Sequence, residues 1–176
     1  MQNPDNAIQL ISLGSFDKNL MLNTTKALEK IFGRIVYYQQ VYQDLSVFFD
    51  ANRRQYNGNQ LLQFINENYA KEGTKTVGLV NVDLFIPILT FIYGQAYLNG
   101  NSGIASMYRL GNERYGLKPN PQILEERFIK EVVHELGHCY GLIHCHQPDC
   151  VMRSSTYVED IDQKNSTFCS HCRNLL

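Results

Sequence analysis

The residues able to bind a metal ion are concentrated in the last quarter of this 176-residue chain. All five histidines and all five cysteines fall between positions 134 and 172. Imidazole nitrogens and thiolates are ligands that zinc prefers, so such crowding indicates metal binding. Because Glu135 directly follows the first of these histidines, the pattern favours a zinc ion that activates water over one that only holds a loop.

The histidines follow the pattern His-Glu-x-x-His-x-x-Gly-x-x-His, which begins at His134 and ends at His144. On a helix of 3.6 residues per turn, His134 and His138 lie on one face, so both imidazoles can reach a single ion. Glu135 lies about 100° round the axis, which keeps its carboxylate beside the ion and free to accept a proton from water. Gly141 can adopt a left-handed conformation, end the helix and return the chain so that His144 becomes the third ligand.

Two histidines four apart usually mark a solvated helix face or a satisfied pair in the core. The full pattern, however, would arise by chance with a probability on the order of 10⁻⁵ at this chain's frequencies of His, Glu and Gly. Three neutral imidazoles leave a fourth position open for water, whose pKa zinc can lower to about 7. We therefore predict a zinc-dependent peptidase.

The cysteines form two pairs with the spacing of metal ligands. The pairs are Cys145 with Cys150, and Cys169 with Cys172. Four thiolates in tetrahedral geometry make a closed structural zinc site, and the paired spacing disfavours the alternative of unligated buried cysteines. Cys139 is left over, and we expect it to pack as a small apolar group. His171 lies inside the second pair and could replace a thiolate, but we expect an exposed loop histidine.

The segment from 134 to 172 closely resembles the archaemetzincin family of metallopeptidases, which belongs to the metzincin clan. Besides the histidine motif, the likeness rests on His144-Cys145, Cys150-Val151-Met152 and Phe168-Cys169-Ser170-His171-Cys172. The resemblance implies two zinc ions per chain. A catalytic ion would be held by His134, His138 and His144, with Glu135 as general base. A structural ion would be held by the four paired cysteines, and Met152 would be the methionine of the turn below the active site.

Apolar periodicity predicts an α+β fold. We expect strands over 8–13, 34–43 and 76–84, helices over 17–32 and 60–70, and a hairpin of 91–98 with 104–110. A longer helix should run from Pro121 to Tyr140, because Asn120 can cap it and proline suits its first position. The resemblance implies a compact metzincin-like domain. In it a twisted mixed sheet is backed by helices, and the long active-site helix leads into a small, irregular, zinc-stabilised C-terminal part.

Length and composition favour a single metallopeptidase domain over residues 1–176. Residues 1–140 would supply the sheet and helices, and residues 141–176 the zinc-stabilised part. Sixteen Lys and Arg against 17 Asp and Glu give a net charge of −1, so nucleic acid is not an expected partner. The apolar region 77–98 is interrupted by polar residues and Pro87, so we expect no membrane span.

The polar start Met1–Asn6 lacks the features of a signal peptide, so we expect a cytoplasmic protein with reduced cysteines. Its partner would be a peptide or protein substrate, extended along a strand edge near 91–98. Zinc would polarise the scissile carbonyl while Glu135 takes a proton from the zinc-bound water and later delivers it to the leaving amine.

Two alternatives remain open from the sequence. One is a zinc-stabilised peptide-binding or adaptor module that is catalytically silent. The presence of Glu135 beside three histidines weighs against it, because a structural site needs a fourth protein ligand and no base. The other is a zinc amidase acting on a non-protein amide, which the ligands alone do not distinguish from a peptidase.

Overall fold

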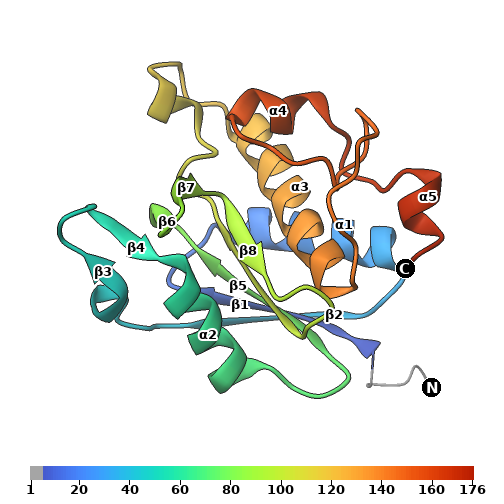
Figure 1. Cartoon of the computed structure of the whole chain (residues 1–176), viewed down its shortest axis with the longest axis horizontal. Helices are drawn as coiled ribbons and strands as arrows, with labels where there is room; N and C mark the ends of the chain where they lie inside the picture. The colour runs from blue at the N-terminus through green and yellow to red at the C-terminus, as the bar shows by residue number, and fades with distance from the viewer. Residues whose placement is uncertain (1–5) are drawn as a thin grey trace.

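The computed structural model describes residues 6–176 and shows the α+β class predicted from the sequence (Figure 1). The strands are β1 (Ile8–Leu13), β2 (Val36–Val41), β3 (Phe49–Asp50), β4 (Gln55–Asn57), β5 (Lys75–Val80), β6 (Leu84–Ile86), β7 (Leu89–Ile92), β8 (Gly94–Ala96) and β9 (Ser102–Ser106). The α-helices are α1 (Lys18–Phe32), α2 (Gly58–Tyr69), α3 (Pro121–Cys139), α4 (Val158–Gln163) and α5 (Ser170–Arg173), and single 3-10 turns cover Ser46–Phe48 and Asn112–Tyr115.

The larger sheet has the strand order β2-β1-β5-β9-β8. Its strands are parallel except for β8, which runs antiparallel to β9 at the edge. Helices α1 and α3 cover one face of this sheet and α2 covers the other (Figure 1). A smaller sheet, β3-β4-β6-β7, was not expected from the sequence.

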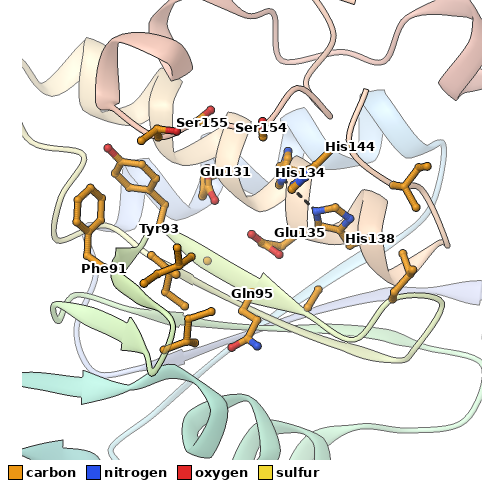
Figure 2. Close-up of a pocket in the computed structure, with 18 of the residues that line it drawn as sticks. Phe91, Tyr93, Gln95, Glu131, His134, Glu135, His138, His144, Ser154 and Ser155 are labelled. Atoms are coloured by element: carbon orange, nitrogen blue, oxygen red, sulfur yellow. Dashed lines mark hydrogen bonds between the residues drawn. The ribbon is translucent and has the colours of Figure 1, made fainter. Parts of the chain in front are cut away.

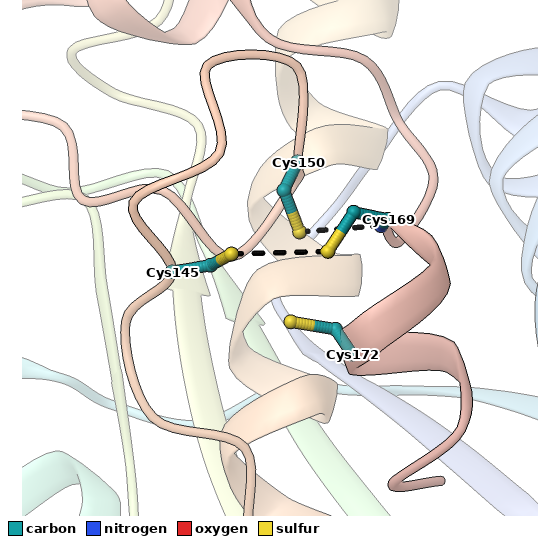
Figure 3. A group of neighbouring side chains, drawn as sticks. All are labelled: Cys145, Cys150, Cys169 and Cys172. Carbon is teal, nitrogen blue, oxygen red and sulfur yellow. Dashed lines mark hydrogen bonds between the residues drawn. The ribbon is translucent and has the colours of Figure 1, made fainter.

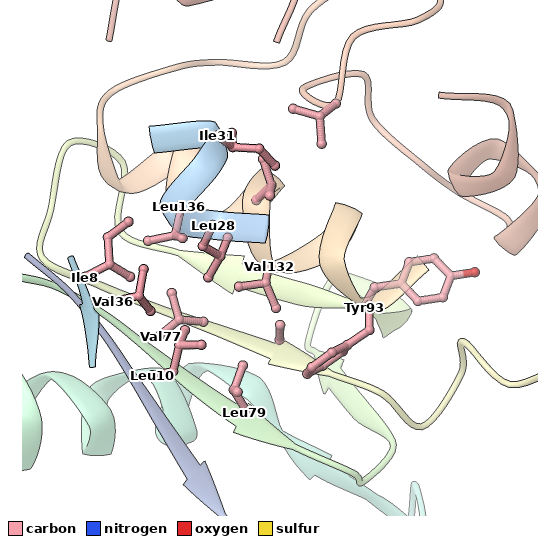
Figure 4. Packing of buried hydrophobic residues seen from close by; sticks show 14 of the residues in the cluster. Ile8, Leu10, Leu28, Ile31, Val36, Val77, Leu79, Tyr93, Val132 and Leu136 are labelled. Carbon is pink, nitrogen blue, oxygen red and sulfur yellow. The ribbon is translucent and has the colours of Figure 1, made fainter. Parts of the chain in front are cut away.

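Side chains that alternate along the central strands supply a core on each face of the larger sheet. Ile8 and Leu10 of β1 belong to the cluster under α1 and α3, whereas Ile11 and Leu13 belong to the cluster under α2. Figure 4 shows the first cluster, in which Val132 and other α3 side chains pack onto the strands. Helix α3 is therefore held by its apolar face against the middle of the sheet.

Three strand predictions were wrong in their bounds. The apolar stretch 76–84 does not form one strand, because β5 ends at Val80 and Leu84 starts β6 in the smaller sheet. Asp83 turns away between them to accept two hydrogen bonds from the Arg109 guanidinium, both at 2.6 Å. The stretch 91–98 is also divided, since Ile92 ends β7 and Gly94 begins β8. The predicted hairpin is formed by β8 and β9, but its second strand begins at Ser102 and ends at Ser106 and does not cover 104–110.

The predicted bounds of the helices agree with the structure to within about two residues. Asp17 caps α1 through its side chain and Gly33 ends it with a φ of 65°. Helix α2 begins two residues earlier than expected, because the Asn57 side chain caps it. Beyond α3 the chain is irregular apart from the short α4 and α5.

None of the helices in residues 6–176 is both long enough and apolar enough to cross a bilayer. Most of the polar start Met1–Asn6, on which the expectation of a cytoplasmic location depends, lies outside the described residues.

Candidate metal centres and active-site cleft

Helix α3 carries two of the three candidate histidines on its inner face (Figure 2). The side chain of Asn120 accepts a hydrogen bond from the Ile123 N–H at 3.1 Å and Pro121 stands in the first turn, as the sequence predicts. Near the other end of the helix, the rings of His134 and His138 have centroids 4.6 Å apart.

Backbone carbonyls fix the orientation of these two imidazoles. Nδ1 of His134 lies 2.8 Å from the Val151 oxygen, and Nδ1 of His138 lies 2.7 Å from the Leu142 oxygen. Because a carbonyl oxygen only accepts hydrogen bonds, each Nδ1 donates a proton and each Nε2 keeps its lone pair. The two Nε2 atoms face each other at 3.1 Å, where their lone pairs would repel without a cation. Two nitrogens on one tetrahedral zinc ion lie about 3.3 Å apart, so the arrangement fits a shared zinc ion.

The turn after α3 delivers the third histidine. Gly141 has a φ of 91°, its N–H donates to the His138 oxygen at 2.9 Å, and the Leu142 N–H donates to the Gly137 oxygen at 2.9 Å. This pair of bonds is typical of a helix that ends at a left-handed glycine, as predicted. The His144 ring then lies 5.3 Å from that of His134, measured between centroids. One nitrogen from each of the three histidines lies within 4.8 Å of the others.

Burial lowers the pKa of all three imidazoles, most strongly that of His134. Neighbouring positive groups, Lys164 among them, lower these pKa values further. The rings are therefore neutral near pH 7. Neutral imidazole is the form that coordinates a metal ion.

Glu135 and the three histidines line the same cleft, which has a volume of about 570 Å³. Its side chain is 3% exposed, and its Oε2 atom has no hydrogen-bond partner. Burial, followed by the charge of Glu131, raises the pKa of this carboxyl well above its ordinary value. Glycine at position 94 makes room for the carboxylate, since a Cβ there would lie 2.6 Å from Oε1 of Glu135. The site thus holds a buried carboxyl group, with one oxygen free of hydrogen bonds, beside three converging imidazoles.

The four paired cysteines meet in a second cluster between the chain after α3 and the start of α5 (Figure 3). Their sulfurs all lie within 4.8 Å of one another, and none is in a disulfide. The Sγ atoms of Cys145 and Cys169 are 3.8 Å apart, which is about the separation of two sulfurs on one tetrahedral zinc ion at 2.3 Å each.

Backbone N–H groups favour the thiolate form at some of these sulfurs, whereas burial raises the pKa of Cys150 and Cys172. The Gln147 N–H donates to Sγ of Cys145 and the Cys169 N–H donates to Sγ of Cys150, both at 3.4 Å. A backbone hydrogen bond from Cys172 is the main cause that lowers the pKa of Cys169 to about 7. Such hydrogen bonds favour the charged sulfur, which is the form that binds zinc.

The extra ligand-type residues stay out of both clusters. Cys139 is fully buried in α3, as expected of a small apolar group. His171 is exposed on α5, and neither it nor His146 belongs to either of the groups in residues 6–176 able to hold a metal ion.

Met152 is fully buried under α3. A Cβ at Gly137 would overlap its sulfur, so the thioether packs directly against the backbone of the helix between the two histidines. The Met152 oxygen also accepts a hydrogen bond from the Cys145 N–H at 3.0 Å. This residue therefore joins the helix that carries the histidines to the cysteine cluster.

The far part of the cleft is lined by Phe91, Tyr93, Glu131, Ser155 and Lys164. The first two lie in the stretch 91–98 that the sequence predicts as a substrate edge, whereas sequence reasoning missed the other three. Of these, only Glu131 could have been found, since it lies four residues before Glu135 and so on the same helix face. Ser155 and Lys164 come from the C-terminal region, which meets α3 only in the folded chain.

The model of Peptidase family M54 matches residues 23–176. The chain belongs to this family, the archaemetzincins. Curated archaemetzincins from two organisms illustrate the range of similarity. The protein of Haloquadratum walsbyi is 30% identical over 172 residues, covering 96% of this chain and 98% of the relative. The protein of Pyrococcus horikoshii is 40% identical over 127 residues, covering 70% of this chain and 66% of the relative.

Solved archaemetzincin structures share the fold. The protein of Archaeoglobus fulgidus superposes with a TM-score of 0.82 at 32% identity, covering 97% of this chain and 99% of that one. The protein of Methanopyrus kandleri gives a TM-score of 0.84 at 28% identity, covering 98% and 94%. The family and fold predicted from the sequence are thereby confirmed. As a member of the archaemetzincin family, the chain is a zinc metallopeptidase, a hydrolase.

Proposed function

We propose that a catalytic zinc ion is held by His134, His138 and His144 and that Glu135 is the general base of peptide hydrolysis. One observation carries this proposal. The Nε2 lone pairs of two imidazoles face each other at 3.1 Å because both Nδ1 atoms donate to backbone carbonyls. The Glu135 carboxylate, whose Oε2 atom has no hydrogen-bond partner, lines the same cleft.

Zinc supplies Lewis-acid chemistry when bound, since it polarises a carbonyl and makes water acidic near neutral pH. Glu135 then moves the proton: its carboxylate takes one from the attacking water and delivers it to the leaving amine. The raised pKa of this carboxyl strengthens it as a base. Burial of the carboxylate also keeps bulk water from competing for the proton.

We also propose that Cys145, Cys150, Cys169 and Cys172 hold a second, structural zinc ion, and that Met152 is the methionine of a turn below the catalytic site. Support comes from sulfur separations that suit tetrahedral coordination and from the packing of Met152 on Gly137.

Residues 1–176 would then function as a single domain. The first hydrophobic core includes side chains from both the sheet-and-helix part, residues 1–140, and the C-terminal part, residues 141–176. Removal of one part would therefore expose the core of the other.

We propose that the substrate binds as an extended peptide along β8. This strand is the edge of the larger sheet and lines the cleft. The N–H of Tyr97 and the oxygen of Tyr93 bond toward β9, so the alternation of an antiparallel pair leaves the backbone of Gly94 and Ala96 facing away from β9. Replacement Ala96→Pro removes one N–H from this edge. We expect it to raise KM with little change in kcat, and an unchanged KM would exclude pairing at this strand.

Cleavage of a mixed peptide library by the zinc-loaded protein tests the proposed function. We expect fragments that disappear when zinc is removed by a chelator and return when it is restored. The same treatment of His138→Ala, with its fold checked by circular dichroism, should yield none. Fragments that persist without zinc, or in that variant, would contradict the proposal.

A further inference from the structure

The cleft continues past the histidines along α3 into a pocket whose groups the proposed hydrolysis does not use. This side pocket is lined by Phe91, Tyr93, Glu131, Ser155 and Lys164. In Figure 2, Phe91, Tyr93, Glu131 and Ser155 lie together on the side of the cleft away from His138. The pocket combines an acidic group, aromatic walls and hydroxyls, a combination typical of a site that binds part of a substrate.

Glu131 is the central group of the side pocket. It lies one helical turn before Glu135, at a spacing of about 6 Å along the axis. Its side chain is 4% exposed. The ion pairs found in residues 6–176 are Arg109 with Asp83 and Arg127 with Asp162, so no cation of these residues lies within 4.0 Å of the Glu131 carboxylate. A buried carboxylate without a counter-charge is costly unless a ligand supplies one.

The balance of charge decides which ligand fits. Lys164 is 2% exposed, and its charge partly offsets the rise that burial causes in the pKa of both Glu131 and Glu135. Its ammonium, however, donates a hydrogen bond to the Arg153 oxygen at 3.0 Å. One ammonium therefore serves two carboxyl groups, and Glu131 has no counter-charge of its own within 4.0 Å in residues 6–176. A substrate cation would supply that counter-charge. A substrate anion on Lys164 would instead leave both carboxylates without a counter-charge.

The uncharged groups of the side pocket suit the same ligand. The hydroxyls of Tyr93 and Ser155 are buried and have no hydrogen-bond partner, and both can accept hydrogen bonds from an ammonium or guanidinium. The rings of Phe91 and Tyr93 stand nearly perpendicular, with centroids 5.4 Å apart. Aromatic faces pack against alkyl stems and attract cations.

We propose that Glu131 binds a positively charged group of the substrate next to the bond to be cleaved, with the hydroxyls of Tyr93 and Ser155 as additional acceptors. This inference rests on the proposed function, because the position of the pocket is defined by the histidines and Glu135. The cation has two possible sources in a peptide. It is either a lysine or arginine side chain or the α-ammonium of the N-terminus. The first source gives an enzyme selective for basic residues, and the second gives an aminopeptidase.

Small zinc-binding probes distinguish these sources without requiring turnover. The hydroxamate of Nα-acetyl-norleucine is neutral, that of Nα-acetyl-lysine has a side-chain cation, and that of norleucine has an α-ammonium. Each is titrated by calorimetry into the zinc-loaded wild-type protein and into Glu131→Gln, which keeps the shape and removes the charge. The matched control is Glu126→Gln, which removes the same charge from the exposed face of the same helix.

We expect one of the two cationic probes to bind wild type and the Glu126 variant at least about tenfold more tightly than the neutral probe, a difference of ~1.4 kcal/mol. In Glu131→Gln this ratio should fall below about threefold. Equal affinities for all three probes, or a ratio that survives in Glu131→Gln, would overturn the inference while leaving the zinc site intact. No binding of any probe would overturn the zinc site itself, and with it this inference.

Discussion

Replacement Gly94→Ala tests whether the position of the Glu135 carboxylate matters for catalysis. A Cβ at position 94 would lie 2.6 Å from Oε1 of Glu135 and 2.7 Å from the backbone oxygen of Ile104. Since ordinary contact begins at 3.4 Å, the carboxylate must retreat by about 0.8 Å if the sheet stays in place. Misplacement of a reacting group by about 1 Å can lower the rate by a factor on the order of 10². We therefore expect kcat to fall about 10²-fold while zinc affinity changes little.

The assay has two parts. Steady-state kinetics are measured on a peptide taken from the library, and zinc affinity is measured by competition with a chelator. Gly103→Ala is the matched control on the neighbouring strand, because the atoms nearest to a Cβ there are Ala96 Cβ at 3.3 Å and Glu135 Cβ at 3.4 Å, and the carboxylate is not among the three nearest. We expect the control to lose much less activity. The overpacked Gly94→Ala variant should also lose about 1–3 kcal/mol of unfolding free energy, which urea denaturation measures separately.

The kinetic constants identify which neighbour gives way. If β8 moves away from the Ile104 oxygen, the substrate edge moves with it and KM rises more than kcat falls. If Glu135 moves, kcat falls alone. A folded, zinc-loaded Gly94→Ala enzyme with kcat and KM both within about threefold of wild type would refute the reasoning.

Other regions give further predictions. Loss of the second metal in the double variant Cys169→Ser with Cys172→Ser should weaken zinc binding at the histidines by about tenfold or more, because the cysteine cluster holds the segment that delivers the third histidine. Metal analysis with chelator competition measures this, and an unchanged affinity would mean that the two sites are independent. Gly137→Ala forces a methyl group onto the Met152 sulfur and should cost about 1–3 kcal/mol of stability; a melting temperature equal to wild type would contradict that packing. Arg127→Ala removes a buried guanidinium that donates to an α4 carboxylate and to a backbone oxygen, each at 2.7 Å, and should cost about 3 kcal/mol in urea denaturation.

The sequence predicted those parts of the site that depend on local geometry. The spacing of His134 and His138 determines a shared helix face, and Gly141 ends the helix in the conformation that its missing Cβ allows. The cysteine cluster followed from paired spacing, because few chain segments other than metal sites place thiols in such pairs. The inferences about the histidines and Gly141 need only the residues themselves and the stereochemistry of one turn.

The rest of the cleft could not be predicted in this way. Lys164 follows Glu131 by more than 30 residues and reaches it only because the C-terminal part folds back over α3. Gly94 is one of 12 glycines, and its contact with Glu135 depends on the register between β8 and β9. The stretch 76–84 gave the wrong strand bounds for a related reason, since apolar periodicity does not show that Asp83 leaves the strand to bind Arg109.

The central claim is that Glu135 moves the proton in a peptide hydrolysis at the three histidines. The most direct measurement compares kcat of wild type and Glu135→Gln, each loaded with zinc and with its metal content determined. Removal of the base should lower kcat by about 10²–10⁴-fold at equal zinc content and similar KM. A Glu135→Gln enzyme that keeps its zinc and cleaves peptides within about threefold of the wild-type rate would contradict the account.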